Sequence, residues 1–598
     1  MPDCSSLIVS EETGDYIIEY NSLYFEQIQR QDGVCISCIN DTWCILYTNY
    51  PGSRNINIQQ GYYSVPKLYG LMDTTSFDAS GITATLNQPL LNVRGQGVLI
   101  GFLDTGIDYL REDFKASGGR TRIAAVWDQT IQSVNYEEDT GEAAGTEQYD
   151  REQVQGMVQY GTVYTREDIN AALAAEREGQ NPYDIVPSRD ENGHGTFLAG
   201  VACGNKIDER NFSGVAPLAD ICVVKCREAK DGLKRYFRIG GDKVVYGEQD
   251  IMLGIKYLWQ TAVKAEKPLI ICFGIGTNIG GHERGGCLGE YLESRGNYSG
   301  VCAVAACGNE ANAGHHYRSG LLRSGQDVEV ELRTGSDDGF TIELWGDAPN
   351  LYAIGIISPS GEYSGKTTAK LGEQHRIRFV LEKTVVDIDY LITAYESGDE
   401  CVRLRFSSVE PGLWKIRVFN DNRGDGFFDM WLPIKNFITD ETYFLESDPD
   451  VTICNPANNI AILSNAYYNS YTTSAVADSS RGYTRSGYIK PDICSPGIDI
   501  FGPMASVITD RTQKGDVSLA RYGYMSGSSA ATAITAGAAA LLMEWGIIRK
   551  NDITMDTVSV KKYLIRGTIN TGVEVPNRIC GYGGIDLYGV FQTMRGRI

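Results

Sequence analysis

Four uninterrupted apolar runs of strand length constrain the fold of this chain most strongly. They are VLIGFLD (98–104), ADICVVKC (219–226), PLIICFGI (268–275) and CAVAACGN (302–309). Helical segments such as DIMLGIKYLWQTAVKA (250–265) separate them. A strand without a polar face must be buried on both sides, and alternation with helices favours parallel pairing. The pattern therefore predicts an α/β fold with a doubly wound, mainly parallel sheet.

The chain is too long for one such domain, because its 598 residues exceed the roughly 250–300 that a single core usually holds. Residues 316–450 differ in character, since alternating segments such as DVEVELRT and CVRLRFS predict an antiparallel β-sandwich or jelly roll. The α/β pattern resumes afterwards, so the larger domain comprises residues 64–315 and 451–598. Residues 1–63 predict a small α/β unit, and a Pro- and Gly-marked stretch at 61–73 suits a linker.

The charge balance and the N-terminus restrict partners and location. The chain has 54 basic and 76 acidic residues, a formal charge of -22, which argues against nucleic acid or an anionic membrane as main partner. It lacks a run of about 18 apolar residues, so we expect no membrane span. The first residues show no basic segment followed by an apolar core, so we expect no secretory signal peptide. The 15 cysteines are scattered, and those in apolar runs, Cys222, Cys272, Cys302 and Cys307, are then expected to be reduced, buried thiols of an intracellular protein.

Metal sites are weakly indicated. A Cys35-x-x-Cys38 pair has no second pair or histidine cluster to complete a zinc site. Asp108, Asp113 and the loop 205–209 could hold a structural calcium ion, although solvated surface acids are the alternative interpretation. We therefore assign no metal ligands and expect no cofactor to be required for catalysis.

Two side chains that could act as acid or base lie at the ends of predicted elements, Asp104 at the end of a strand and His194 at the start of a helix. Asp104 ends the first apolar run, and a residue at the carboxyl end of a parallel strand points into the crevice where such sheets bind ligands. His194 lies between Gly193 and Gly195, which allow close approach of another backbone, and it precedes a small-residue helical run. Taken singly, each residue has a structural alternative: Asp104 could be a turn residue after a strand, and His194 could be a core histidine.

Two further segments complete the pattern. Ser529 follows Gly527 and Ser528 at the start of an alanine-rich helical run, where unpaired backbone N–H groups favour a developing negative charge. By itself this serine could be an ordinary helix cap. Asn309 ends another apolar run after Gly308.

The order Asp104, His194, Asn309, Ser529 resembles the subtilisin-like serine proteases (subtilases, the S8 family) and differs from the order in chymotrypsin and the α/β-hydrolases. The resemblance covers both parts of the larger domain. It implies that Ser529 Oγ attacks a peptide carbonyl, that His194 transfers the proton and that Asp104 orients the imidazole. It also implies that the Asn309 side chain and the Ser529 N–H bind the oxyanion. A lipase or esterase is disfavoured, since the serine lacks a G-x-S-x-G turn.

The resemblance also implies where a substrate lies. An extended peptide would pair with the strand end at residues 273–276, and small residues would leave room for a large apolar or aromatic side chain. The implied substrate-binding residues are Phe273, Gly274, Ile275, Gly276, Ala305, Ala306 and Glu310. The chain departs from the family pattern at Ala530, Ala533 and Phe197, which we interpret as variation in packing.

The flanking segments resemble a narrower group. A prodomain at residues 1–63 and a β-sandwich between Asn309 and Ser529 are similar in layout to the clostridial Csp germination proteases, which cleave the precursor of a spore cortex hydrolase. This resemblance implies autoprocessing between Tyr63 and Ser64, a prodomain bound at the active site, a protein or peptide substrate, and a cytoplasmic or spore-associated location. Some members of the group have lost triad residues, so a catalytically silent regulator or binding protein is the alternative function.

Overall fold

The computed structural model describes residues 79–131, 158–506 and 521–595, apart from short gaps at 90, 159, 209–211, 230, 242, 371–373 and 395–396, together with three strands near the N-terminus. The chain divides into two compact units, Met1–Leu71 and Met72–Ile598.

The first unit contains a three-stranded antiparallel sheet. Its strands are β1 (Thr13–Glu19), β3 (Trp43–Asn49) and β2 (Val34–Cys38), in that spatial order. The Cys35-x-x-Cys38 pair therefore belongs to β2. The predicted cleavage position at Tyr63 and Ser64 lies outside the described residues.

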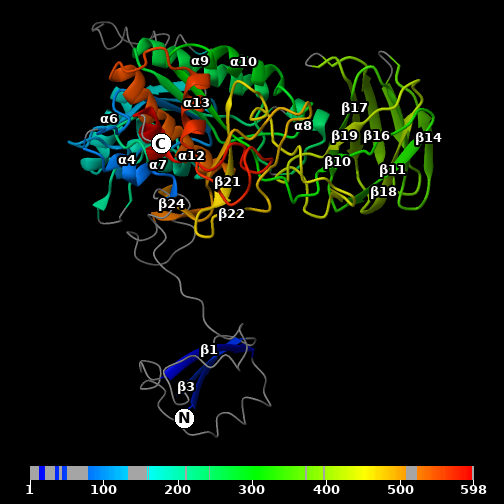
Figure 1. Cartoon of the computed structure of the whole chain (residues 1–598), viewed down its shortest axis with the longest axis horizontal. Coiled ribbons are helices and arrows are strands. Elements are labelled where there is room, and N and C mark those ends of the chain that lie inside the picture. Colours follow the sequence, from blue (N-terminus) through cyan, green and yellow to red (C-terminus); the bar gives the residue numbers. More distant parts are fainter. Residues whose placement is uncertain are drawn as a thin grey trace. The chain divides into compact units, whose positions relative to one another are not determined.

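The second unit is built on a nine-stranded sheet that is mainly parallel, as predicted (Figure 1). Its order is β22-β21-β9-β8-β4-β7-β5-β6, with β23 paired to β21. The strands are β4 (Leu99–Asp104), β5 (Ile123–Asp128), β6 (Thr162–Thr165), β7 (Asp220–Lys225), β8 (Leu269–Phe273), β9 (Val301–Ala306), β21 (Leu463–Asn469), β22 (Ser474–Ala475) and β23 (Ile493–Pro496). Within the described sheet, only β6 and β22 pair antiparallel. The four apolar runs of the sequence are β4, β7, β8 and β9, which lie side by side.

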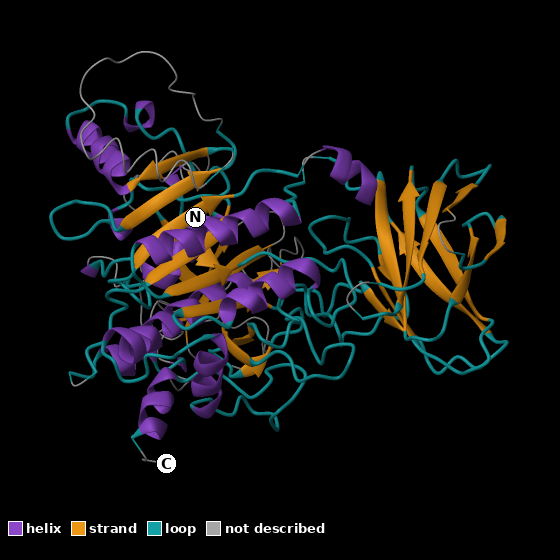
Figure 2. Cartoon of the chain, turned by 90° about the horizontal axis from the view of Figure 1, so that it is seen from above, coloured by secondary structure: helices purple, strands orange, loops and turns teal. Residues whose placement is uncertain are grey.

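Helices cover both faces of this sheet (Figure 2), which explains why its strands lack a polar face. The helices of one face share a hydrophobic core, and they are α4 (Ile82–Leu86), α6 (Arg166–Arg177), α7 (His194–Cys203), α12 (Ser528–Met543), α13 (Thr557–Arg566) and α14 (Leu587–Met594). Those of the other face are α9 (Glu248–Lys264) and α10 (Gly286–Gly296). Among the described helices, Ser528–Ile548, which joins α12 to a π-helical turn, is the one long and apolar enough to cross a membrane, but its most apolar stretch is 83% buried. That burial identifies it as a core helix.

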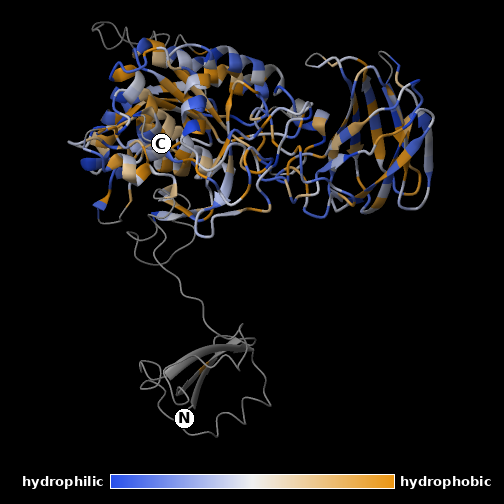
Figure 3. Ribbon diagram, in the orientation of Figure 1, coloured by the Kyte–Doolittle hydropathy of each residue, from blue (hydrophilic) through white to orange (hydrophobic). Residues whose placement is uncertain are grey.

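Residues His316–Phe444 form two antiparallel sheets. The first contains, in order, β10 (His316–Arg318), β19 (Phe428–Trp431), β12 (Gly339–Gly346), β17 (Glu400–Ser407), β16 (Val385–Leu391) and β15 (Gln374–Arg378). The second contains β14 (Tyr363–Thr367), β13 (Tyr352–Ile357), β18 (Gly412–Asn420), β11 (Asp327–Thr334) and β20 (Tyr443–Phe444). Apolar and polar residues alternate along the strands of the two sheets (Figure 3). The apolar side chains form one core between the sheets.

The inserted sheets dock on the α/β domain through the outer face of β12, which is buried along its whole length. The Thr341 hydroxyl donates to the carbonyl oxygen of Phe237, 2.7 Å away, at the end of α8 (Asp231–Phe237). Glu343 accepts a hydrogen bond from the Gly280 N–H at 2.8 Å. The chain leaves and re-enters the α/β domain at one point, where the Cys454 N–H donates to the Cys307 carbonyl at 2.8 Å.

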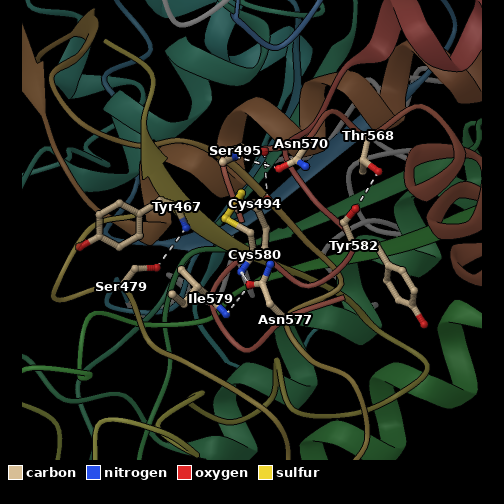
Figure 4. The surroundings of a disulfide bond; sticks show 12 residues. Tyr467, Ser479, Cys494, Ser495, Thr568, Asn570, Asn577, Ile579, Cys580 and Tyr582 are labelled. Atoms are coloured by element: carbon tan, nitrogen blue, oxygen red, sulfur yellow. Dashed lines mark hydrogen bonds between the residues drawn. A yellow bond between two sulfur atoms is a disulfide. The ribbon is translucent and has the colours of Figure 1, made fainter. Parts of the chain in front are cut away.

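The predicted buried thiols Cys222, Cys272, Cys302 and Cys307 are confirmed, whereas two other cysteines form a disulfide. Cys494 on β23 is bonded to Cys580 across 86 residues of sequence (Figure 4). The Asn577 side chain accepts hydrogen bonds from the N–H groups of Ile579 and Cys580, forming a turn that presents Cys580 to β23. Eight other described cysteines are buried thiols. The pairing depends on this tertiary contact, which has no local sequence signal.

Candidate active site

Asp104 and His194 form the central hydrogen-bonded pair of the site. Asp104 ends β4 with its side chain buried, and the Thr105 N–H donates to its Oδ1 at 2.8 Å. His194 is the first residue of α7, and its Nδ1 lies 2.8 Å from Asp104 Oδ1 and 2.9 Å from Oδ2. Because the carboxylate can only accept, the ring proton is on Nδ1 and Nε2 is left as the basic nitrogen.

The environment of His194 favours its charged form. Burial acts to lower the pKa of the imidazole, but the charge and hydrogen bond of Asp104 and the charge of Asp190 outweigh it, so the pKa is raised. The side chain nevertheless keeps 23% of its surface accessible, which leaves a route for a substrate. This arrangement suits a base that accepts a proton and stays protonated briefly.

Asp190 is a site residue that the sequence analysis did not identify. One carboxylate oxygen accepts from the Thr105 hydroxyl at 2.8 Å and from the Gly193 N–H at 2.7 Å. The other accepts from the N–H and hydroxyl of Thr196 at 2.9 and 2.6 Å. Asp190 therefore ties the turn after β4 to the start of α7. Its position four residues before the histidine, next to a Gly-His turn, was the available signal.

Ser529 lies at the start of α12, and Asn309, which follows β9, contacts the same helix start. Ser529 is the second residue of this helix, so its N–H belongs to the first turn, where backbone donors have no acceptor within the helix. The Asn309 side-chain oxygen accepts from the Ser528 N–H at 3.0 Å. This hydrogen bond fixes the orientation of the amide, whose NH₂ group is a hydrogen-bond donor in addition to the Ser529 N–H. Gly527 has a φ of 142°, and a Cβ there would meet the Asn309 amide nitrogen at 3.4 Å. In this structure Ser529 Oγ donates to the Gly274 carbonyl at 2.8 Å.

One cavity of about 820 Å³ is lined by Asp104, His194, Asn309 and Ser529. Of the residues predicted to bind substrate, those that also line it are Phe273, Gly274, Ile275, Gly276, Ala306 and Glu310. Ala305 does not, because neighbouring residues of a strand face opposite ways and its side chain packs into the core under α9 and α10.

Glu310 has a more specific position than the sequence indicated. Its carboxylate is 3% exposed and lies 2.7 Å from His315 Nδ1. The other oxygen accepts from the Lys435 N–H at 3.1 Å. Glu310 therefore connects the segment of Asn309 to the inserted β domain, in addition to lining the cavity.

Calcium binding near Asp108 and Asp113 stays a hypothesis, but both side chains are buried, so the interpretation of these two residues as solvated surface acids is wrong. No group of three or more His, Cys, Asp or Glu side chains is placed to hold a metal ion in the part of the chain that the structure describes. Asp113 accepts from Arg111 Nε at 2.8 Å and from the Tyr522 hydroxyl at 2.5 Å. Asp108 accepts from the Ser506 N–H at 2.9 Å. Protein donors therefore contact both carboxylates.

Comparison with known proteins agrees with the fold and the order of the site residues. The sequence matches the subtilase family, Peptidase_S8, over residues 95–583. The chain belongs to the subtilase family of serine proteases, and the predicted membership is confirmed.

Two relatives are informative. The solved structure of the Clostridium perfringens CspB protease is similar with a TM-score of 0.71 and 28% identity, covering 87% of this chain and 98% of that one. Serine protease AprX of Bacillus subtilis (strain 168) is 39% identical over 109 residues, which is 18% of this chain and 23% of that protein. The chain thus spans less than a quarter of the length of that curated relative.

Proposed function

We propose that the chain is a serine endopeptidase whose catalytic residues are Asp104, His194 and Ser529, with Asn309 in the oxyanion hole. The observation that carries the proposal is the 2.8 Å contact between His194 Nδ1 and Asp104 Oδ1, in a cavity that Ser529 and Asn309 also line. An oriented imidazole, a serine at a helix start and two converging N–H donors are the parts that acyl transfer requires.

The reaction begins when the Ser529 side chain rotates from the Gly274 carbonyl to His194 Nε2. Ser529 Oγ attacks the substrate carbonyl while Nε2 takes its proton, and Asp104 stabilises the imidazolium. The Asn309 amide and the Ser529 N–H bind the oxyanion of the tetrahedral intermediate. His194 then protonates the departing amine, and a water molecule activated by His194 hydrolyses the acyl-enzyme.

A fluorophosphonate probe tests this proposal directly. The expected result is that the probe labels the wild-type chain at Ser529, after any bound prodomain is displaced, and that the chain cleaves a protein substrate. A Ser529→Ala variant, which removes only the attacking oxygen, is the matched control and should do neither. A correctly folded wild-type chain that is never labelled would favour the silent regulator or binding protein instead.

We extend the proposal to autoprocessing. Residues 1–63 would act as a prodomain that is cut between Tyr63 and Ser64 and stays at the active site as an inhibitor. The support is the Pro- and Gly-marked stretch at 61–73, at the C-terminal end of the compact unit Met1–Leu71. N-terminal sequencing of the purified chain should find a new end at Ser64 in the wild type and an intact Ser529→Ala chain. A Ser529→Ala chain cut at that bond would contradict self-cleavage.

The natural substrate that we propose is the precursor of a spore cortex hydrolase. The support is the similarity to the CspB protease over nearly the whole of that chain and the resemblance in layout of the sequence to the Csp group. Incubation with the purified precursor should yield one shortened product with wild-type enzyme and none with Ser529→Ala. General degradation of the precursor, or no cleavage by enzyme that does cut other proteins, would exclude this substrate.

A further inference from the structure

The inserted β domain contributes a wall to the catalytic cavity. Besides the triad, the cavity is lined by Trp345 on β12, by Arg403 on β17 and by the residues Ile434–Phe437, which follow β19. We call Ile434–Phe437 the wall segment. The family resemblance accounts for the lining from the α/β domain, whereas the wall segment belongs to the insertion.

The wall segment is held in place by the α/β domain through backbone contacts. The Asn278 side-chain amide donates to the Leu432 carbonyl, just before the segment, at 3.2 Å. Glu310 accepts from the Lys435 N–H at 3.1 Å. The Lys243 ammonium donates to the Phe437 carbonyl. A wall fixed at three points loses little freedom when a substrate binds, which is a requirement for selectivity.

The side chain of Phe437 is the apolar element of this wall. It is half-buried and packs with Phe237 against the buried cluster that includes Ile239 and Val245. All four of these residues line the cavity. Apolar surface that is shared by two domains and open to a catalytic cavity favours an apolar side chain of a bound peptide.

We propose that Phe437 is a specificity-determining residue. With Phe237 and Ile239 it forms a subsite that accepts one large apolar side chain of an extended peptide substrate. Its lining differs from the substrate-binding residues predicted on the α/β domain, such as Gly276 and Ala306, because Phe437 belongs to the insertion. The inference rests on the proposed protease function, and it assigns to the insertion a part in choosing the substrate.

A peptide series with Phe437→Ala tests the proposal. For each peptide position, kcat/KM is compared between a peptide with Leu or Phe and its Ala counterpart. At one of the peptide positions that do not flank the scissile bond, the wild type should prefer the large apolar residue. Phe437→Ala should reduce the ratio of kcat/KM between the large apolar peptide and its Ala counterpart about 10-fold at that position. Phe437→Leu should give an intermediate ratio. An unchanged ratio in Phe437→Ala, or an equal loss for every peptide, would overturn the proposal.

Two controls separate this inference from folding defects and from the proposed function. Phe427 lies in the same insertion with 39% of its surface exposed and does not line the cavity, so Phe427→Ala should keep the wild-type ratio. Fluorescence anisotropy in a Ser529→Ala background measures peptide binding without catalysis. Selective binding of apolar peptides by the Ser529→Ala chain, together with no cleavage of them by the wild-type chain, would refute the protease proposal and support the subsite. Equal binding of both peptides would refute the subsite alone.

Discussion

The hydroxyl of Ser529 donates a hydrogen bond to the carbonyl oxygen of Gly274, 2.8 Å away. The same glycine lies against His194, since a Cβ on Gly274 would be 3.3 Å from His194 Cε1 and 2.5 Å from Leu198 Cδ2. Gly274 therefore holds the serine in its resting position and gives the imidazole room to lie between Asp104 and the substrate.

This closeness predicts that Gly274→Ala lowers kcat/KM about 100-fold, because a methyl group would push the imidazole or Leu198 out of position. Peptide hydrolysis measures the loss, and the melting temperature shows whether the fold persists. Gly320→Ala is the matched control, since a Cβ there has nothing within 4 Å. Full activity in Gly274→Ala would contradict the placement of His194.

The oxyanion role that we propose for Asn309 predicts a loss confined to kcat. Asn309→Asp keeps an oxygen to accept from the Ser528 N–H, 3.0 Å away, but replaces the NH₂ donor by an acceptor. We expect kcat to fall about 100- to 1,000-fold with KM little changed, the magnitude known for the equivalent donor in subtilisin. Steady-state kinetics decide between this outcome and a rise in KM alone, which would mean that Asn309 contacts only the ground state.

The raised pKa of His194 predicts the acidic limb of the pH profile. The base must be neutral to take a proton from Ser529, so kcat/KM is low below the pKa and rises above it. Since Asp104 is a main cause of the increase, the midpoint should lie above the usual pKa of histidine. Asp104→Asn should lower kcat about 10⁴-fold and move the midpoint of the residual activity to lower pH. A midpoint unchanged by this substitution would assign the limb to another group.

A buried ion pair beneath the sheet predicts a large effect on stability. Lys490 Nζ lies 2.7 Å from Asp492 Oδ2, and both side chains are almost fully buried. Burial lowers the pKa of Lys490 to about 8, against the opposing charge of Asp492. Lys490→Met should lower the free energy of unfolding by about 3 kcal/mol, because the buried Asp492 carboxylate then keeps only the more distant Lys561 ammonium, 3.4 Å from its Oδ1. Urea unfolding measures this, and Lys562→Met at an exposed position should change it by less than about 0.5 kcal/mol.

The sequence predicted the features that have local signals. The buried strands could be predicted because their apolar runs are continuous in the sequence. Asp104, His194 and Ser529 could be predicted because each lies at the end of a strand or the start of a helix. Ala305 shows the limit of this reasoning, since the two-residue period of a strand turns it away from the cavity while Ala306 faces it. Phe437 was not predicted, because its place in the cavity depends on how β12 docks.

The segments that lead into and out of the inserted domain meet at the hydrogen bond between the Cys454 N–H and the Cys307 carbonyl. A domain whose entry and exit are adjacent can be replaced by another without moving the strands on either side. Evolution can therefore exchange the inserted domain for another while the α/β domain stays unchanged. Because its exit lies beside Asn309 and its wall segment lines the cavity, such an exchange could give a new substrate range to an unchanged catalytic centre.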